Sequence, residues 1–596
     1  MIRLAAFLAS HLLILAALAA TAWVAGRLAI RRWIETEGLE RFVVSTALGL
    51  ALLAHAAFAL GALGQLRRGP LILLLAAVHL LGFPVWRDAL RKSWGWGRQT
   101  LPRLLPAGFG LVVALAPLFV LALYPPTGFD ETLYHLPFAR AFARSGSLPY
   151  LPELRLPVFP QLNELLFTGM LLLADDVATH LVQLLATLLT AALLLAWGRR
   201  YFSPAVGWLA AGTFLGNPIV VHLAGTGYIE PGLALFITAA VFALERWRES
   251  RGSGWLALAA VFASSAAGIK YLGLFFVGAV LIAALPNAIR QRRIRELILA
   301  SVVSIAVLAP TYGRILFYTG SPLFPFYPEI FGSNLWNPEP MPGRSLSQRL
   351  TAYASIPWDV LFERDSVGNM PPYSPAYLLG LPLLVWGFVR NVRVRRLLGM
   401  AFAYSLLFPI LPPDSRYLAV ILPLLSLALG GSLAIWNLRR WVLPAIAVLL
   451  FLPGWLYGLH RIEREGRLPV TAEARDRYLA REVPGYAALQ YLNRVRGKRY
   501  VVYGVHAENL VYYAEGTLLG DWNGPASFRR VLPAMDVPEA FHHRLRKVGA
   551  GYLLRFRMDP SSLPRDPRWR RHFRRIYADG SAEIYELSPF SSLPGT

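Results

Sequence analysis

An adjacent pair of carboxylates followed by two arginines is the part of this chain whose residue types and spacing most readily suggest chemistry. Asp130 and Glu131 directly follow a long apolar segment, and Arg140 and Arg144 come shortly after them. Carboxylates beside a membrane-spanning segment are costly and mark functional sites. The two arginines are four residues apart, so they share one face of a helix. We therefore expect Asp130 and Glu131 at the mouth of a bilayer, where a carboxylate can act as a base.

Four further polar residues stand at the ends of later apolar segments. Glu230 begins the segment after the sequence GTGYI, and Lys270 closes the segment that ends in GIKY. Arg416 and Tyr417 open the segment after PPDS. They are far apart in the sequence, but the topology derived below places them all on the outer face of the membrane. This gathering is the main argument for a site, because residues at unrelated positions would fall on either face about equally.

Each of these residues also has a plain structural explanation. Asp130 could cap the helix that follows, with Glu131 near the positive end of its dipole. Arg140, Arg144 and Lys270 could extend to lipid headgroups. A metal site is not favoured, because an Asp-Glu pair separated by three residues from His135 matches no common zinc pattern.

The elements that must position these residues are those of a membrane protein. Hydrophobic residues make up 56% of the 596 residues and charged residues 16%. The apolar residues occur in runs close to the roughly 20 residues needed to cross a bilayer. The chain has no cysteine, which excludes disulfides, thiol nucleophiles and Cys-ligated zinc. It also has no Walker A motif, no G-x-S-x-G and no strand-linked G-x-G-x-x-G, so a cytoplasmic nucleotide enzyme is unsupported.

The basic residues define a topology. About 14 spans can be assigned by the 20-residue criterion. The net charge of +24 comes from arginines in short links between apolar runs, and one alternating topology puts nearly all these links on a single side, which the positive-inside rule makes cytoplasmic. Nucleic-acid binding is therefore not needed to explain the charge. The links lie around Arg27, Arg91, Arg199, Arg246, Arg290, Arg393 and Arg439.

The predicted fold class is an α-helical polytopic membrane protein with a small C-terminal α/β domain outside the membrane. Residues 1–103 supply about three N-terminal spans, and residues 104–459 form a core of about 11 spans. Two large loops of the core, 125–176 and 320–375, lie on the outer side. Residues 460–596 are soluble in character and form the α/β domain.

Local signals fill in two regions of this scheme. Residues 162–174 are expected to form an outer-surface or re-entrant helix, because a crossing there would move every later basic link to the outer side. The C-terminal domain alternates helix-like and strand-like segments. We expect helices over 472–495, 508–515 and 538–548, strands over 499–505 and 552–556, and a hairpin turn at Asp579-Gly580.

The motifs together resemble a known superfamily. An apolar helix leads into F-D-E-x-x-Y-H-L-x-x-A-R, and many spans later G-x-K-Y and S-R-Y-L occur at outer helix ends. This arrangement, from Leu104 to about Leu459, resembles the GT-C membrane glycosyltransferases, particularly the bacterial relatives of protein O-mannosyltransferases and of aminoarabinose transferases. The Asp-Glu pair after the first core helix is its most specific element.

The resemblance implies a reaction and roles for the candidate residues. A sugar passes with inversion from a polyprenyl-phosphate donor to a lipid, glycan or protein acceptor, on the outer face of a bacterial cytoplasmic membrane. Asp130 is the expected general base, and Glu131 orients the acceptor or the sugar. No soluble cofactor is implied, a metal is optional, and membrane lipids rather than nucleic acid are the other partners. The expected substrate-binding residues are Arg140, Arg144, Glu230, Lys270, Arg416 and Tyr417.

The competing interpretation is a polytopic transporter or lipid flippase. In that case Glu230, Lys270 and Arg416 would be intramembrane charges that serve transport. Transporters often contain an inverted repeat, but the Asp-Glu segment has no second copy in this sequence. A third interpretation, a non-catalytic assembly scaffold, leaves the acidic pair unexplained.

Overall fold

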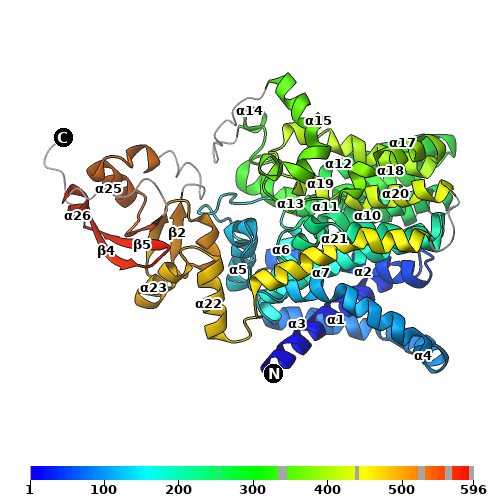
Figure 1. The fold of residues 1–596 in the computed structure, drawn as a ribbon, viewed down its shortest axis with the longest axis horizontal. Coiled ribbons are helices and arrows are strands. Elements are labelled where there is room, and N and C mark those ends of the chain that lie inside the picture. Colours follow the sequence, from blue (N-terminus) through cyan, green and yellow to red (C-terminus); the bar gives the residue numbers. More distant parts are fainter. Residues whose placement is uncertain are drawn as a thin grey trace. The chain divides into compact units, whose positions relative to one another are not determined.

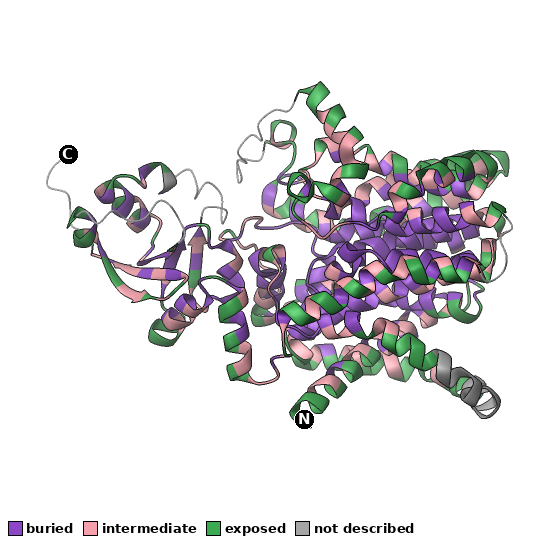
Figure 2. Cartoon of the chain, in the orientation of Figure 1, coloured by how far each residue is buried: buried purple, intermediate pink, exposed green. Residues whose placement is uncertain are grey.

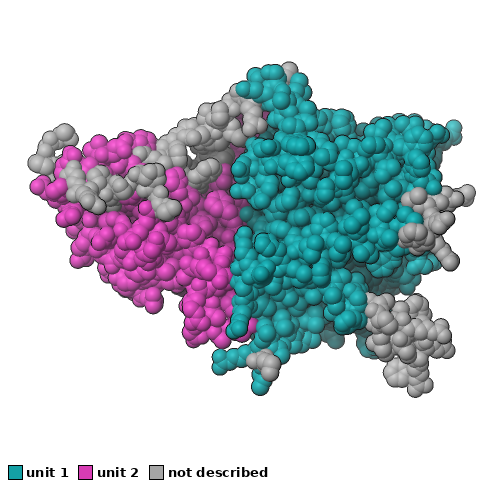
Figure 3. Space-filling view, viewed as in Figure 1, with its two compact units in different colours: residues 1–124, 160–313, 340–468 teal, residues 125–159, 314–339, 469–596 magenta. Residues whose placement is uncertain are grey.

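The structure, a computed structural model, divides into two compact units. It describes residues 2–250, 252, 254–332, 345–436, 442–520, 531–557 and 567–589. Residues 1–124, 160–313 and 340–468 form one unit, which we call the helical unit. Residues 125–159, 314–339 and 469–596 form the other, the sheet unit (Figure 3). The loop that carries Asp130 therefore belongs to the same unit as the C-terminal segment. Of the predicted features, Arg439 and residues 333–344 of the second loop lie outside the described residues.

Long apolar helices confirm a multi-pass membrane protein. In the described part of the chain, six helices are long and apolar enough to cross a membrane, or up to eight if each of two bent helix pairs is one span. Five further apolar helices are shorter. The six are α1 (Ile2–Ile30), α2 (Gly38–Ala62), α7 (Val177–Tyr201), α12 (Gly273–Arg290), α13 (Ile294–Thr319) and α21 (Val442–Glu465).

Each of the two bent helix pairs has a short break between its helices. One joins α3 (Arg68–Leu81) to the start of α4 (Phe83–Leu121) with a bend of 52°. The other joins α8 (Pro204–Leu215) to α9 (Pro218–Ala224) with a bend of 74°; the sequence predicts a single span over residues 205–223 here. The proline at the start of α9 has no N–H to donate.

At the second bend, the side chain of Asn217, the residue before that proline, hydrogen-bonds to backbone carbonyl groups at the end of α8. The Asn217 side-chain nitrogen donates to the carbonyl oxygens of Thr213 at 2.7 Å and Phe214 at 3.1 Å. Gly216 is required for close packing, because a Cβ there would lie 1.8 Å from the Leu450 carbonyl oxygen of α21. Local residues therefore produce the break and also hydrogen-bond the carbonyl groups beside it, as backbone polar groups at membrane depth require.

The interior of the helical unit is formed by helices that are apolar on every side. Figure 2 shows the buried residues concentrated there, and Figure 1 shows the helices that carry them. In α10 (Glu230–Glu249) every residue from Glu230 to Trp247 is buried. A helix that is hydrophobic all round belongs in a core. Its neighbours by contact are α7, α11 (Gly254–Ile269) and α12.

Shorter helices complete the helical unit. The residues predicted as an outer-surface or re-entrant helix form α6 (Leu162–Leu173), too short to be counted among the long spans. Its position relative to a membrane stays a prediction. The other short helices are α15 (Leu346–Phe362), α16 (Ala376–Leu379), α17 (Leu381–Arg390), α18 (Val392–Ser405), α19 (Arg416–Ala419) and α20 (Leu422–Leu433).

The sheet unit contains a five-stranded mixed sheet with the order β2-β1-β3-β5-β4. Strand β1 pairs in parallel with β2 and β3, whereas β5 pairs antiparallel with β3 and β4. The core on the sheet includes Tyr503, Phe541, Leu553, Trp569 and Phe573. The strands are β1 (Val501–Gly504), β2 (Thr517–Gly520), β3 (Tyr552–Phe556), β4 (Phe573–Ala578) and β5 (Ala582–Leu587).

Most local predictions for this domain are confirmed. The two expected strands are β1 and β3, and the hairpin lies between β4 and β5, where the Asp579 carboxylate accepts the N–H of Ser581 and of Ala582. The expected long helix is split into α22 (Ala472–Glu482) and α23 (Tyr486–Arg496), because Pro484 and Gly485 stand between them. Residues 508–513 form a 3₁₀ helix, η5 (Glu508–Tyr513), and β2 was not predicted. The last helices are α25 (Pro538–Lys547) and α26 (Pro567–His572).

Candidate functional site

A buried ion pair joins two of the predicted residues in the helical unit. Glu230 is the first residue of α10, where a carboxylate is favoured by the helix dipole. Lys270 directly follows the end of α11, and its Nζ donates to Glu230 Oε1 at 2.9 Å. The same ammonium lies 4.5 Å from the centre of the Tyr417 ring. Since Glu230 is only 2% exposed, the pair is held away from bulk water.

Arg416 is fixed in a similar way at the start of α19. Its Nε and Nη2 donate to Asp414 Oδ2 at 2.8 and 2.6 Å. The other oxygen of Asp414 accepts the backbone N–H of Arg416 at 3.0 Å. The guanidinium lies 4.6 Å from the centre of the Tyr228 ring, a cation–π distance. Each of the two cations, Lys270 and Arg416, is therefore paired with one carboxylate and one aromatic face.

The segment around Arg416 is anchored by two buried tyrosines. The Tyr404 hydroxyl donates to the Tyr417 carbonyl oxygen at 2.7 Å, and the Tyr373 hydroxyl donates to the Ser415 carbonyl oxygen at 2.6 Å. These bonds fix the backbone that presents the guanidinium. We call the assembled side chains the cationic cluster. Its members are Tyr228, Glu230, Lys270, Asp414, Arg416 and Tyr417.

The structure thus brings together four of the predicted site residues from three distant segments. An isolated charge inside a membrane protein is costly, so polar side chains there pair with one another. The sequence did not single out Asp414 or Tyr228 as site residues. Asp414 could have been predicted from the sequence, because an aspartate two residues before an arginine at a helix start can accept bonds from the backbone and the side chain of that arginine.

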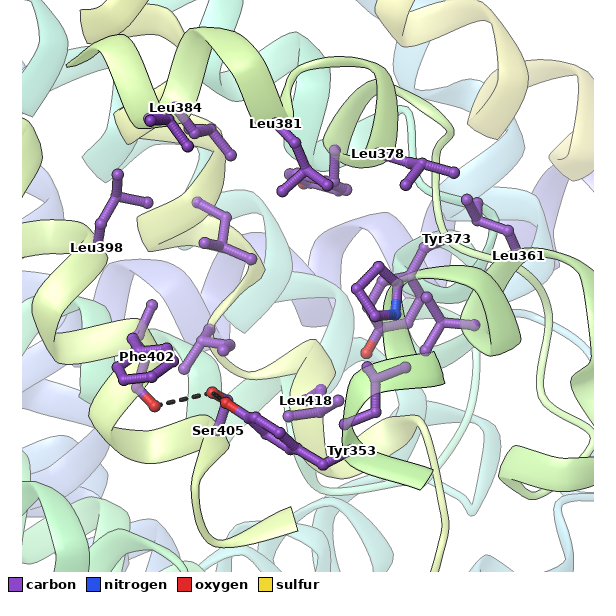
Figure 4. Close-up of a pocket in the computed structure, with 18 of the residues that line it drawn as sticks. Tyr353, Leu361, Tyr373, Leu378, Leu381, Leu384, Leu398, Phe402, Ser405 and Leu418 are labelled. Carbon is purple, nitrogen blue, oxygen red and sulfur yellow. Dashed lines mark hydrogen bonds between the residues drawn. The ribbon is translucent and has the colours of Figure 1, made fainter. Parts of the chain in front are cut away.

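A large apolar cavity adjoins this cluster, and no pattern in the sequence predicted it. It has a volume of about 790 Å³ and lies among α15, α17, α18 and the residues after Arg416 (Figure 4). Leu418, one residue beyond Tyr417, is part of its wall, and so is Tyr373, which holds the Ser415 carbonyl. The hydroxyl groups of Tyr353 and Ser405 bond to each other at 2.8 Å and so do not make the wall strongly polar.

The acidic segment of the sheet unit has a different geometry. Residues Glu131–His135 form a single π-helical turn, η1, directly before α5 (Leu136–Ser145). Such turns are rare and occur frequently at functional sites. The Tyr134 hydroxyl donates to Asp130 Oδ2 at 2.9 Å. Asp130 makes no side-chain capping bond, so a capping role does not account for it.

The two adjacent carboxylates are in different environments. Glu131 is fully buried, and its Oε2 accepts the backbone N–H of Gly128 at 3.0 Å. Asp130 is partly exposed. Glu131 thus stabilises the backbone turn that leads into η1, whereas the Asp130 carboxylate is the more accessible of the two.

The two arginines after the acidic pair contact residues of the C-terminal segment in the same unit. Arg140 donates to the Tyr512 carbonyl oxygen, and to that of Val511 at 3.1 Å. Burial, with Arg144 nearby, lowers the pKa of the Arg140 guanidinium. Arg144 forms a half-exposed ion pair with Glu515 at 3.3 Å. These bonds give both arginines a structural role, and their predicted role in substrate binding stays a prediction.

Among the residues that the structure describes, no group of three or more histidine, aspartate or glutamate side chains is arranged to hold a metal ion. This holds for the neighbourhood of His135 as well, which is buried beside the rings of Tyr134 and Phe159.

Two segments of the chain match protein-family models. Residues 160–313 match the model for dolichyl-phosphate-mannose-protein mannosyltransferases; this segment includes Glu230 and Lys270. Residues 474–586, within the sheet unit, match a family described as "SF2091/S2213". No curated protein matches the chain by sequence.

Two solved structures have a similar fold. One is ArnT from Cupriavidus metallidurans in the apo state, with a TM-score of 0.55 and 16% identity over 83% of this chain and 98% of that one. The other is the same protein bound to undecaprenyl phosphate, with a TM-score of 0.54 and 14% identity over 82% of this chain and 98% of that one. At this identity the likeness shows a common fold, and it extends over nearly the whole of ArnT.

Proposed function

We propose that the chain is a GT-C-type membrane glycosyltransferase that transfers a sugar from a polyprenyl-phosphate donor to a lipid, glycan or protein acceptor, which its mannosyltransferase-like segment and its ArnT-like fold support. The observation that carries this proposal is the apolar cavity beside the cationic cluster. A polyprenyl phosphate has an anionic head on a long apolar chain, which are the two properties that this pair of features complements.

Lys270 and Arg416 are proposed to bind the donor phosphate. A guanidinium can bind phosphate oxygens in a bidentate way, and a compact ammonium can approach as a point charge. Both cations are paired with a carboxylate, and both are backed by an aromatic ring. As the bond between the anomeric carbon and the phosphate oxygen breaks, its electron pair goes to the phosphate, and nearby cations stabilise the charge that develops.

The apolar cavity is proposed to hold the first part of the polyprenyl chain. Its wall is formed mainly by leucine, phenylalanine and tyrosine side chains of the helices from α15 to α20. The ArnT structure with bound undecaprenyl phosphate has a similar fold, which supports a ligand of this class.

Asp130 is proposed as the general base. The acceptor hydroxyl or amine attacks the anomeric carbon from the side opposite the phosphate, which inverts its configuration, and its proton passes to the carboxylate. Two features support Asp130 over its neighbour: its side chain is partly exposed, and it makes no side-chain capping bond. Glu131 would orient the acceptor or the sugar through the backbone turn that it fixes.

The location follows from the arginine distribution and the same fold likeness. We place the protein in the cytoplasmic membrane of a bacterium, with Asp130, Lys270, Arg416 and the C-terminal domain on the outer side. Cysteine introduced at Ser145 of the cysteine-free chain should react with an impermeant thiol reagent in cells without an outer barrier. Labelling only after lysis would contradict this orientation.

The function is tested with Asp130→Asn. The amide keeps the size of the carboxylate but cannot accept a proton, so transfer from a polyprenyl-phosphate sugar pool should fall about 10²–10⁴-fold with unchanged thermal unfolding in detergent. Asp536→Asn, at an exposed position of the sheet unit, is the matched control and should retain full activity. A folded and fully active Asp130→Asn would remove the base from this position, and inactive Glu131→Gln in the same assay would move it to Glu131.

A further inference from the structure

The acidic segment is fastened to the C-terminal domain on both sides of Asp130. On its N-terminal side, the Tyr513 hydroxyl donates to the carbonyl oxygen of Pro126. On its C-terminal side, Arg140 donates to the carbonyl oxygens of Tyr512 and Val511. All of these residues belong to the sheet unit. The two fastenings flank the short stretch that carries both carboxylates.

Packing supports the same attachment. The π-helical turn η1 and the following helix α5 both contact the 3₁₀ helix η5. The Arg140 guanidinium also lies 5.2 Å from the centre of the Tyr512 ring, so it contacts this residue through both its backbone and its side chain. Arg144 adds the ion pair to Glu515 just after η5. Residues more than 370 positions apart in the sequence thus meet along one short helix.

The helix η5 is in turn held rigidly on the domain. Asn493 of α23 donates to the Tyr513 carbonyl oxygen at 2.9 Å and accepts the N–H of Glu515 at 3.0 Å. The Tyr500 hydroxyl, at the start of the sheet, donates to the same Asn493 at 2.5 Å. The Tyr486 ring packs edge-on against Tyr513, with 5.1 Å between their centres. A continuous series of bonds therefore leads from the sheet to the acidic segment.

We propose that the C-terminal domain positions the acidic segment, with Tyr513 and Arg140 as the positioning residues. The activity part of this inference depends on the proposed function, because it concerns the same carboxylate. A general base on a loop needs support, since catalytic groups must be held within about 0.5 Å of their working position, and a displacement of about 1 Å can cost on the order of 100-fold in rate. Arg140 then acts through Asp130 and does not contact the substrate.

The inference is tested with Tyr513→Phe, Arg140→Met and the double variant, in the full-length protein in lipid nanodiscs. Hydrogen exchange of peptides covering residues 128–136 should become faster in each variant, most in the double. Transfer at saturating substrate should fall roughly 10- to 100-fold in the double variant, while binding of undecaprenyl phosphate is unchanged. Arg140→Lys keeps a donor that can reach one carbonyl oxygen and should recover part of the rate.

Arg494→Met is the matched control, because Arg494 is an exposed arginine of the same unit that bonds to Gln490 within its own helix. It should change neither exchange nor transfer. Unchanged exchange of residues 128–136 in the double variant would overturn the inference. So would a loss of transfer in Arg140→Met that appears only as a higher KM for the acceptor, because Arg140 would then bind substrate. A fully active Asp130→Asn would reject Asp130 as the base. The hydrogen exchange of residues 128–136 would then alone decide whether the C-terminal domain positions the acidic segment.

Discussion

Two charged clusters of the helical unit combine carboxylates and cations in different proportions. In the cationic cluster, each cation is paired with one carboxylate and one tyrosine ring. In the second cluster, each carboxylate is shared by two arginines. Glu40 binds Arg246 at 3.0 Å and Arg200 at 3.4 Å, and Glu245 binds Arg248 and, at 3.0 Å, Arg396. We call this second group the carboxylate-centred cluster.

We interpret the difference as one between the proposed donor site and a structural joint. In the carboxylate-centred cluster, Glu40 of α2 connects α7 with α10, and Glu245 of α10 connects to Arg396 of α18. Its bonds therefore join helices. The bonds of the cationic cluster are made at helix ends beside a large apolar cavity. The same charges are thus expected to affect stability in one cluster and sugar transfer in the other.

The largest effect is expected for Lys270→Met. Loss of a cation that stabilises the leaving phosphate should reduce transfer about 10²–10³-fold and weaken the binding of undecaprenyl phosphate. The single variant also leaves the buried Glu230 without its ammonium, so it will be less stable. The double variant Lys270→Met with Glu230→Gln removes both charges and should regain stability without regaining transfer. If the double variant transfers sugar at the wild-type rate, Lys270 is a structural residue and the comparison fails.

The next effect is expected for Arg246→Met in the carboxylate-centred cluster. Breaking a buried ion pair costs about 3–5 kcal/mol, and slightly less here because Arg200 still pairs with Glu40. Thermal unfolding in detergent should occur at a lower temperature, while transfer per folded molecule stays at the wild-type level. The neutral double variant Glu40→Gln with Arg246→Met should recover much of the stability. A loss of donor binding in well-folded Arg246→Met would show that the two clusters do not differ as proposed.

A smaller effect is expected at the aromatic face behind Lys270. Tyr417→Leu removes the ring and with it a cation–π contact worth roughly 0.5–2 kcal/mol, so the affinity for undecaprenyl phosphate should fall several-fold. Tyr417→Phe keeps the ring and should bind the lipid as the wild type does. Equal affinities for the two variants would mean that the ring face does not contribute.

The smallest effect is expected at an exposed ion pair between α18 and α10, outside the carboxylate-centred cluster. Arg393 pairs with Glu249 at 3.0 Å, and both side chains are about 40% exposed. Such surface pairs contribute about 0–1 kcal/mol and are screened by salt. Arg393→Ala should therefore change the unfolding temperature little, and less still at high salt, with no change in transfer. A large loss of stability would show that exposed pairs matter in this unit as much as buried ones.

Predictions from the sequence were most accurate where the signal lies in neighbouring residues. The start of α10 at Glu230, the end of α11 before Lys270 and the hairpin at Asp579 were all expected, because apolar runs, prolines and turn residues act locally. The span predicted over residues 205–223 did not anticipate the bend between α8 and α9, because the packing of α21 against Gly216 cannot be read from the sequence. For the site, the sequence found both cations but missed Asp414 and the cavity.

The sequence by itself determined that this is a multi-pass membrane protein with an acidic pair after an apolar helix and a small α/β domain at its end. These properties depend on the composition of short segments and on motifs of neighbouring residues. Only the tertiary structure decided which charges meet: Lys270 with Glu230 across 40 positions, and Arg140 with Tyr512 across 372. Ion pairs and cavities depend on distances in space, and a burial cost is set by every helix that surrounds a charge, so neither can be read from residues that are adjacent in the chain.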